Sequence, residues 1–376
     1  NAHSPLHFRR GPMRFLMLNW RDPNNPLAGG AERVSEKYMR GLMERGHEVA
    51  WFANAFDGAL AEEDLDGLLV ARSGDKFTSW LAARRWVRRQ KPFDLIIDQH
   101  HGIPWYAPWW GRTRCVAYIH EVLGPIWNSF YMWPVSAIGR CQERWTHWFY
   151  RRTQFWTASS FTRDQLKRHG VNNVDTIPYG TDTYALDQLD DKPLTEPLRL
   201  VVVSRLAPNK RIDHSIQVLH ELRGQNVDAR IVIVGSGTEK EKLKALVQRL
   251  GLMDFVEFTG AVAEKEKNRH LCEAHYLVHT SVREGWGLNV IEANALGTPA
   301  AVYPVPGLDE STLHDRTGLI TEAAAPHSLA KTIHHAMKNP EDYQRHRREA
   351  LDRAKSMHWE HILPHACDQL EAWARE

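Results

Sequence analysis

Short apolar runs alternate with amphipathic stretches through the first half of the chain. Residues 14–19 and 48–53 are two such runs, and each of them ends in polar or turn residues. Between them, residues 31–45 carry apolar side chains at helical spacing, with Gly46 as a natural helix end. Later runs at 94–98, 115–119, 155–158 and 174–177 continue the rhythm. This alternation predicts a parallel sheet that is covered by helices on both faces.

The same alternation restarts after a polar break. Residues 186–197 contain four Asp/Glu residues and two prolines, which predicts a linker. A strongly apolar run at 198–203 then opens a second series of strands and helices. The predicted fold class is therefore α/β, with two doubly wound Rossmann-like domains at 1–185 and 197–359 facing each other across a cleft. Ligands of such sheets bind outside the carboxyl ends of the strands.

Composition narrows the class of protein. The chain has 376 residues, of which 43% are hydrophobic and 25% charged, as expected for two globular domains. A formal net charge of +2 gives no reason to expect nucleic-acid binding. The four cysteines lie far apart, without a redox or zinc spacing. No apolar run is long enough to span a bilayer and residues 1–12 lack the apolar core of a signal peptide, so we expect a cytoplasmic protein.

The strongest motif lies in residues 281–293. Glu284 and Glu292 are eight positions apart, with Gly285 and Gly287 between them and a helix predicted from about Leu288. We expect Glu284 to point into the cleft from a loop, and Glu292 to line its wall from the helix. The glycines allow a ligand to approach the backbone, and the helix amides suit a diphosphate. The alternative is a glycine-containing loop with two solvated glutamates that bind nothing. The length of the motif, thirteen residues, makes this alternative less favoured.

Further candidates follow other predicted strands. Arg205 and Lys210 come after the first strand of the second domain and can bind anionic oxygen; a basic surface turn is the alternative. Two glycine pairs, Gly29-Gly30 and Gly235 with Gly237, are weak signals by themselves. His120 ends another strand, with His100 and His101 as rivals. Asp98 and His100 are the nearest approach to a metal site, and we expect no metal.

These motifs resemble the family 4 retaining glycosyltransferases, which have the GT-B fold. Glu284 and Glu292 match the family's E-x7-E motif, and Arg205 and Lys210 its R-x4-K segment. Residues 177–182 resemble its P-N-G-V-D turn, with Tyr179 and Thr181 as departures. The resemblance spans roughly residues 14–366 and is weakest over 57–156, where acceptors are usually selected. We also expect a final helix, within 360–376, to cross back to the first domain.

The resemblance implies a role for each matched residue. Arg205 and Lys210 would neutralise the donor diphosphate, Glu292 would bind the ribose, and Glu284 would hold the transferred sugar. His120 would contact the sugar at the reaction centre. The remaining donor-binding positions are Gly29, Gly30, Gly235, Val262, Gly285, Gly287, Leu288 and Asn289. Catalysis would need no metal and no cofactor. Because no protein nucleophile is evident, we favour front-face attack in which the leaving phosphate takes the acceptor's proton.

The predicted function is transfer of a sugar from a nucleotide diphosphate donor to an acceptor hydroxyl, with retention of configuration. A UDP-sugar is favoured over GDP-mannose, and the acceptor is a glycan, a lipid-linked molecule or a small molecule. A sugar-nucleotide epimerase or phosphorylase and a non-catalytic sugar-nucleotide-binding scaffold are the alternatives. The two domains are expected to close on the donor.

Tryptophan and arginine are interleaved in the predicted helix at 78–91, which contains Trp80, Trp86 and four arginines. This pattern predicts peripheral contact with the inner face of an anionic membrane. Core tryptophans beneath a solvated basic face are the alternative. A second aromatic group is expected on the acceptor side, as a membrane or sugar-stacking surface: Trp105, Tyr106, Trp109, Trp110, Trp127, Tyr131 and Trp133.

Overall fold

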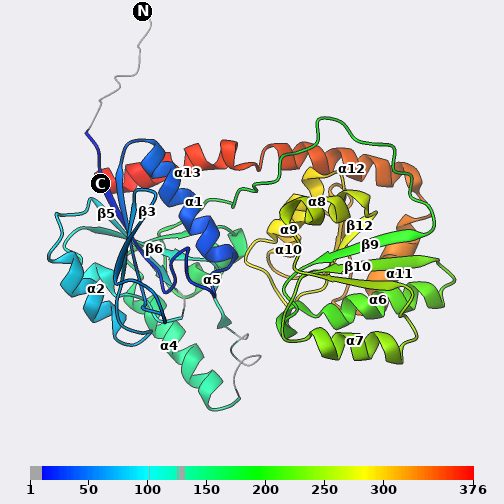
Figure 1. Cartoon of the computed structure of the whole chain (residues 1–376), viewed down its shortest axis with the longest axis horizontal. Coiled ribbons are helices and arrows are strands. Elements are labelled where there is room, and N and C mark those ends of the chain that lie inside the picture. The colour runs from blue at the N-terminus through cyan, green and yellow to red at the C-terminus, as the bar shows by residue number, and fades with distance from the viewer. Residues whose placement is uncertain (1–10, 101, 125–126, 128–131) are drawn as a thin grey trace, which may run out of the picture. The chain divides into compact units, whose positions relative to one another are not determined.

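The computed structural model describes residues 11–100, 102–124, 127 and 132–376, which form two compact units (Figure 1). The first unit contains the chain up to Thr157, Arg163–Ile177 and Leu363–Glu376, and the second contains Ala158–Thr162 and Pro178–Ile362. Among the described residues, no helix is long and apolar enough to cross a bilayer.

Eight strands form the sheet of the first unit, in the order β3-β4-β2-β1-β5-β6-β7-β8. Their bounds are β1 (Arg14–Leu18), β2 (Glu48–Ala53), β3 (Glu62–Leu65), β4 (Leu68–Arg72), β5 (Leu95–His100), β6 (Arg114–Ile119), β7 (Gln154–Thr157) and β8 (Val174–Thr176). In the central β1, residues Phe15, Leu16, Met17 and Leu18 are all fully buried, as in a sheet covered on both faces.

One edge of this sheet differs from the purely parallel arrangement that the sequence predicted. Strands β3 and β4 pair antiparallel, with Leu65 opposite Leu68, whereas the other neighbouring strands are parallel. The hairpin turn contains Asp66 and Gly67, both at positive φ. No apolar run marked β3 in the sequence, because three of its four residues are acidic and an edge strand that faces solvent needs no apolar run.

The helices of the first unit include α1 (Gly30–Glu44), α2 (Ser79–Val87) and α4 (Val135–Phe149), with most of α5 (Ser160–Arg168) and the short η1 (Ala107–Trp109). Helix α1 buries Val34, Tyr38 and Leu42, the stripe that predicted it. Its N-terminus is capped by the carboxylate of Glu32, which accepts a hydrogen bond from the amide of Gly29 at 2.7 Å.

Six parallel strands form the sheet of the second unit, in the order β11-β10-β9-β12-β13-β14. The strands are β9 (Leu198–Val203), β10 (Ala229–Val234), β11 (Val256–Gly260), β12 (Tyr276–His279), β13 (Ala300–Val302) and β14 (Gly318–Ile320). The helices are α6 (Ile212–Gly224), α7 (Lys240–Arg249), α8 (Glu264–Glu273), α9 (Leu288–Ala295), α10 (Leu308–Ser311), α11 (Pro326–Ala336) and α12 (Pro340–Lys355), with the short η3 (Pro208–Lys210).

The polar segment that predicted a linker is fastened to the second unit by one buried lysine. The ammonium of Lys192 donates to the carbonyl oxygens of Cys272 and Ala274 at 2.8 and 2.7 Å, and to the hydroxyl of Thr298 at 2.8 Å. Burial lowers the pKa of Lys192 to about 7. All three N–H donors of the ammonium therefore have acceptors, which offsets the cost of burying it.

The last helix, α13 (Trp359–Arg375), begins in the second unit and ends in the first, as the sequence predicted. In the first unit Arg45 donates to Asp368 and Glu371 at 2.7 and 2.9 Å. Trp373 is buried there, with its ring centre 6.1 Å from that of Trp156. The end of α13 is therefore part of the first unit's core.

Candidate active site

Two loops at the carboxyl end of the second sheet carry most of the predicted donor residues. Strands β9 and β12 are neighbours in this sheet, and loops 204–211 and 280–287 follow them. The backbone amide of Val282 donates to the carbonyl oxygen of Asn209 at 2.9 Å and so joins the two loops. Residues that are far apart in the sequence therefore meet at the carboxyl ends of these two strands, as in other doubly wound folds.

Lys210 and Glu284 form an ion pair at the carboxyl ends of these strands. The Nζ of Lys210 lies 2.5 Å from Oε1 of Glu284, and Nε2 of His279 lies 3.5 Å from the same oxygen. Burial opposes ionisation of Glu284, but the charge of Lys210 and the contact with His279 outweigh it, so the pKa of Glu284 is held below its ordinary value. Burial lowers the pKa of His279 to about 4, so its ring is neutral at pH 7.

Glycines hold the Glu284 loop in its position. Gly307 has a φ of +81°, and a Cβ there would lie 2.1 Å from the carbonyl oxygen of Glu284. Gly287, at φ +78°, is the N-cap of α9, and a Cβ on it would lie 2.6 Å from Oγ of Ser311. Both positions combine a left-handed backbone with a close approach, which only glycine tolerates.

Helix α9 begins at Leu288 and carries the second glutamate of the motif. The amides of Leu288 and Asn289 are in its first turn, where no intrahelical acceptor exists. Glu292 pairs with Lys267 of α8 at 3.0 Å, and Lys267 also pairs with Glu264 at 2.6 Å. Burial raises the pKa of Glu292, and the charge of Lys267 offsets this only in part. Glu292 is thus held by a partner that the sequence did not indicate.

Arg205 lies in the same loop as Lys210 but is exposed. No ion pair or hydrogen bond of its guanidinium is found within the described part of the chain. Gly235, predicted to bind the donor, packs closely against this loop. A Cβ on Gly235 would lie 1.9 Å from the carbonyl oxygen of Ser204. Val262 is half-buried beside the core, and Gly285 is part of the Glu284 loop.

The first unit holds the other predicted residues. Gly29 and Gly30 form the start of α1. Nε2 of His120, just past β6, lies 2.9 Å from Nε2 of Gln99, whose Oε1 accepts a hydrogen bond from Ser35 of α1 at 2.9 Å. The chain from Ser35 through Gln99 therefore orients the ring of His120.

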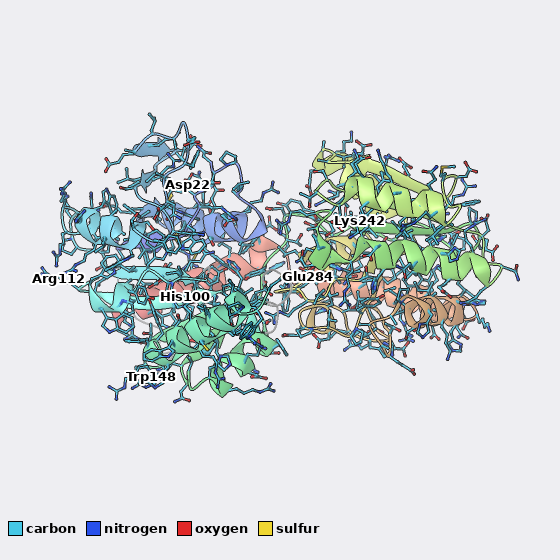
Figure 2. The ribbon with its side chains drawn as sticks, turned by 90° about the horizontal axis from the view of Figure 1, so that it is seen from below. Asp22, His100, Arg112, Trp148, Lys242 and Glu284 are labelled. Carbon is cyan, nitrogen blue, oxygen red and sulfur yellow. The ribbon has the colours of Figure 1, made fainter. Side chains whose placement is uncertain are left out.

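The rival histidine and two tryptophans of the predicted aromatic surface are buried, whereas Trp109 and Trp133 of that surface are exposed. His100 lies inside the first unit (Figure 2). It is buried against Tyr150, with their ring centres 4.5 Å apart. His101 lies outside the described residues, as does Tyr131. Trp105 and Trp110 are also buried and cannot form a stacking platform. On α2, Trp86 donates to Glu62 at 2.7 Å and, like Trp80, packs against the core. Both tryptophans of this helix are thus partly buried against the core, as that alternative expects, and membrane contact through residues 78–91 stays a prediction.

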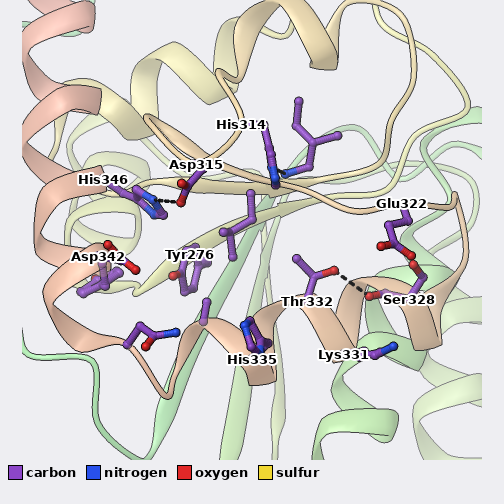
Figure 3. A pocket seen from close by; sticks show the side chains of 15 residues that line it. Tyr276, His314, Asp315, Glu322, Ser328, Lys331, Thr332, His335, Asp342 and His346 are labelled. Atoms are coloured by element: carbon purple, nitrogen blue, oxygen red, sulfur yellow. Dashed lines mark hydrogen bonds and ion pairs between the residues drawn. The ribbon is translucent and has the colours of Figure 1, made fainter.

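A distinct cavity lies at the opposite end of β12 (Figure 3). Tyr276, the first residue of that strand, lines it together with His314, Lys331 and His346. Nε2 of His346 lies 2.9 Å from Oδ1 of Asp315 in its wall. Since Glu284 follows the last residue of β12, this cavity is separate from the candidate site.

Sequence reasoning missed His279 and Lys267. His279 could have been predicted from the sequence, since it ends the strand that leads directly into the Glu284 loop. Lys267 could not have been predicted, because its contact with Glu292 depends on how α8 packs beside α9. Among the described residues, no group of three or more metal-ligating side chains converges.

Comparison with known proteins places this geometry in a family. A family model described as Glycosyltransferase Family 4 matches residues 28–184, and one described as Glycosyl transferases group 1 matches residues 188–353. Together they cover most of both units.

Individual relatives agree with these models. A GDP-mannose-dependent alpha-(1-6)-phosphatidylinositol monomannoside mannosyltransferase of Mycobacterium tuberculosis is 30% identical over 192 residues, about half (49%) of each chain. The glycogen synthase of the same organism is 26% identical over 92% of this chain and 91% of its own. The crystal structure of Anabaena HepE in complex with UDP and glucose superimposes with a TM-score of 0.74, at 19% identity, over 96% of this chain and all of that one. The chain belongs to the family 4 retaining glycosyltransferases and has their GT-B fold.

Proposed function

We propose that this protein transfers a sugar from a nucleotide diphosphate donor to an acceptor hydroxyl, with retention and without a metal ion. The observation that carries the proposal is the Lys210–Glu284 pair at the carboxyl end of the second sheet. A cation and a carboxylate side by side match the two ends of a sugar diphosphate. Arg205, exposed in the same loop, supplies a second cation.

The chemistry requires a separation of charge. The bond between the sugar's anomeric carbon and the phosphate oxygen breaks, and its electron pair leaves with the diphosphate. The acceptor oxygen bonds to the same face of that carbon, and its proton passes to the leaving phosphate. Lys210 and Arg205 stabilise the negative charge that builds on the diphosphate. Glu284 accepts hydrogen bonds from the sugar hydroxyls, and Glu292 from the ribose.

A UDP-sugar is the favoured donor. The Anabaena protein of the same fold was solved with UDP and glucose, whereas a relative of higher local identity is named for its use of GDP-mannose. GDP-mannose is therefore the second candidate. A glycan, a lipid-linked molecule or a small alcohol can serve as acceptor.

A donor screen tests the proposal. UDP, GDP and ADP are compared for the rise they cause in the unfolding temperature, since a ligand that binds only the folded state stabilises it. The matching nucleotide sugars are then incubated with acceptor pools in excess EDTA, and the anomeric configuration of the product is read by NMR. Transfer from one donor with retention supports the proposal.

The same screen distinguishes the alternatives. An epimerised sugar formed without any acceptor would replace the transferase by an epimerase. Tight nucleotide binding with no turnover on any pool would indicate a non-catalytic scaffold. Complete loss of activity in EDTA, or an inverted product, would contradict the metal-free retaining mechanism.

A further inference from the structure

The outer side of helix α4 in the first unit is apolar. Trp133, just before the helix, is 80% exposed, and Ile138 and Trp145 are 65% and 62% exposed. We call this surface the α4 face. Its exposed apolar residues are Met132, Trp133, Val135, Ile138, Trp145, Trp148 and Phe149, with Trp109 of η1 beside them.

The opposite side of α4 shows why these side chains are not needed in the core. Its buried residues are small or polar: Ser136, Gly139, Glu143, Thr146 and His147. The carboxylate of Glu143 accepts the backbone amides of Leu123 and Gly124 at 2.6 and 2.8 Å. The polarity of the helix is therefore reversed relative to an ordinary surface helix, which buries its apolar stripe.

Four of the exposed rings form one continuous aromatic group: Trp109, Trp145, Trp148 and Phe149. Ring centres are 5.7 Å apart between Trp145 and Trp148, and 5.4 Å apart between Trp148 and Phe149. Trp109 joins them with its ring centre 5.6 Å from that of Phe149. Trp148 stands on the outer side of α4 (Figure 2). Large contiguous apolar patches on a protein surface mark sites that bind another protein, a membrane or a ligand.

The charges of the segment 132–153 that are not buried have one sign. Residues 132–153 contain four arginines and a single acidic residue, Glu143, which is buried and engaged with backbone amides. Arg144 lies one turn before Trp148, and the guanidinium of Arg151 stands 4.3 Å from the ring centre of Trp148. The remaining two are Arg140 and Arg152.

We propose that the α4 face docks on the surface of an anionic lipid bilayer. Tryptophan and phenylalanine settle at the level of the headgroups, while arginines reach the lipid phosphates. The fifteen-residue helix is too short to span a bilayer and carries charge, so it lies in the interface. A second copy of this chain is a poorer partner, because two faces with four arginines each would repel. The inference does not depend on which sugar the protein transfers.

Flotation with vesicles tests the proposal on the full chain. Vesicles of phosphatidylcholine alone are compared with vesicles that also contain phosphatidylglycerol, at low and at high salt. The parent protein should float with the anionic vesicles at low salt only. Replacing Arg144 and Arg151 by Ser should weaken this binding about thirtyfold, and replacing Trp145 and Trp148 by Ser about tenfold or more.

A matched control lies on α2, where Arg85 and Arg88 are exposed. Their replacement by Ser removes the same charge from another surface and should leave vesicle binding nearly unchanged. Circular dichroism confirms that each variant is folded. If the α2 variant weakens binding as much as the α4 variants do, the assignment to α4 is overturned.

Cys141 offers a direct readout, because it is exposed on α4. An environment-sensitive fluorophore on Cys141 should shift to the blue with anionic vesicles and remain unchanged with neutral ones. No flotation with anionic vesicles at low salt would overturn the proposal. So would concentration-dependent dimerisation, without lipid, that the Trp145 and Trp148 variant abolishes, because it would make the face an interface between copies.

Discussion

Lys210 and Glu284 meet at 2.5 Å although 74 positions separate them in the sequence. Without a donor, each ion satisfies the other at a partly buried site where an unpaired charge would be costly. A bound diphosphate and sugar would replace both partners at once. The pair therefore keeps two opposite charges ready at the end of the sheet.

Removing either ion should reduce transfer, but for different reasons. Lys210→Met removes the cation that we propose lies at the leaving diphosphate and should lower the transfer rate about a hundredfold or more. It should also abolish part of the thermal stabilisation by the nucleoside diphosphate. Glu284→Gln should lower transfer similarly while retaining that stabilisation, because Lys210 remains available. The control is Lys242→Met, which breaks the exposed pair with Glu239 in the same unit. Near-normal transfer in folded Lys210→Met would refute the assignment.

Gly307→Ala should disable the site through the backbone. The new Cβ would lie 2.1 Å from the carbonyl oxygen of Glu284, so the loop must move. A displacement of this size should cost about a hundredfold in transfer. Gly46→Ala is the matched control, since Gly46 has a φ of +87° but no atom within 4 Å of its added Cβ. That variant should lose only about 1 kcal/mol of stability and keep its activity. If Gly307→Ala and Gly46→Ala lost the same activity, backbone strain alone, and not displacement of the Glu284 loop, would explain the loss.

Stability should fall as the pH drops below 6.5. Burial lowers the pKa of His100, His147 and His275 to about 3 and that of His279 to about 4. The unfolded chain therefore binds protons between pH 6.5 and 4 that the folded chain does not. Each such histidine reduces the free energy of unfolding by up to about 1.4 kcal/mol per pH unit across that window.

Unfolding midpoints measured from pH 7 to pH 4 test this dependence. His100→Phe should flatten it, since both ring nitrogens of His100 are buried without hydrogen-bond partners, two aromatic rings pack against it, and the nearest carboxylate, that of Asp98, lies 3.7 Å away. The exposed His327 provides a control, because His327→Gln should leave the slope as it is. A flat stability profile in the parent protein would contradict the prediction.

Asp98 should be essential to the first unit. Its carboxylate accepts the amides of Trp105 and Ala107 at 3.0 Å and the hydroxyl of Tyr150 at 2.6 Å. Asp98→Ala leaves all three donors buried without a partner and should cost about 3 kcal/mol or more in urea denaturation. Tyr150→Phe, which removes one bond, should cost about 1 kcal/mol. Equal stability of Asp98→Ala and the parent would disprove this role.

The sequence predicted the elements whose signal is local. Residues 198–203 are apolar except for the exposed Arg199 and form β9 with the predicted bounds. The stripe of Val34, Tyr38 and Leu42 likewise marked α1. The Glu284 motif predicted its loop and the start of α9 because glycine spacing reflects backbone geometry, and Gly287 indeed has a positive φ.

Tertiary packing decided the features that the sequence could not predict. Trp80 and Trp86 have the same neighbours in sequence whether they face lipid or core, and only the packing of α2 settles that they pack inward. Conversely, α4 buries Glu143 and exposes Trp145 because the backbone amides of Leu123 and Gly124 need a carboxylate. The Lys267–Glu292 pair likewise depends on two helices meeting.

The last helix has a consequence for the order of folding during synthesis. Leu370 and Trp373 are buried in the core of the first unit, and Leu363 fills the space beside Gly41 of α1. A ribosome releases residues 1–177 long before it makes these partners. The first half of the chain therefore waits, with part of its apolar surface open, until the second unit has emerged. Contacts over more than 300 positions, such as Arg45 with Asp368, make this last step slow. A fragment that ends at residue 177 would be expected to aggregate, whereas the second unit needs no later segment for its core.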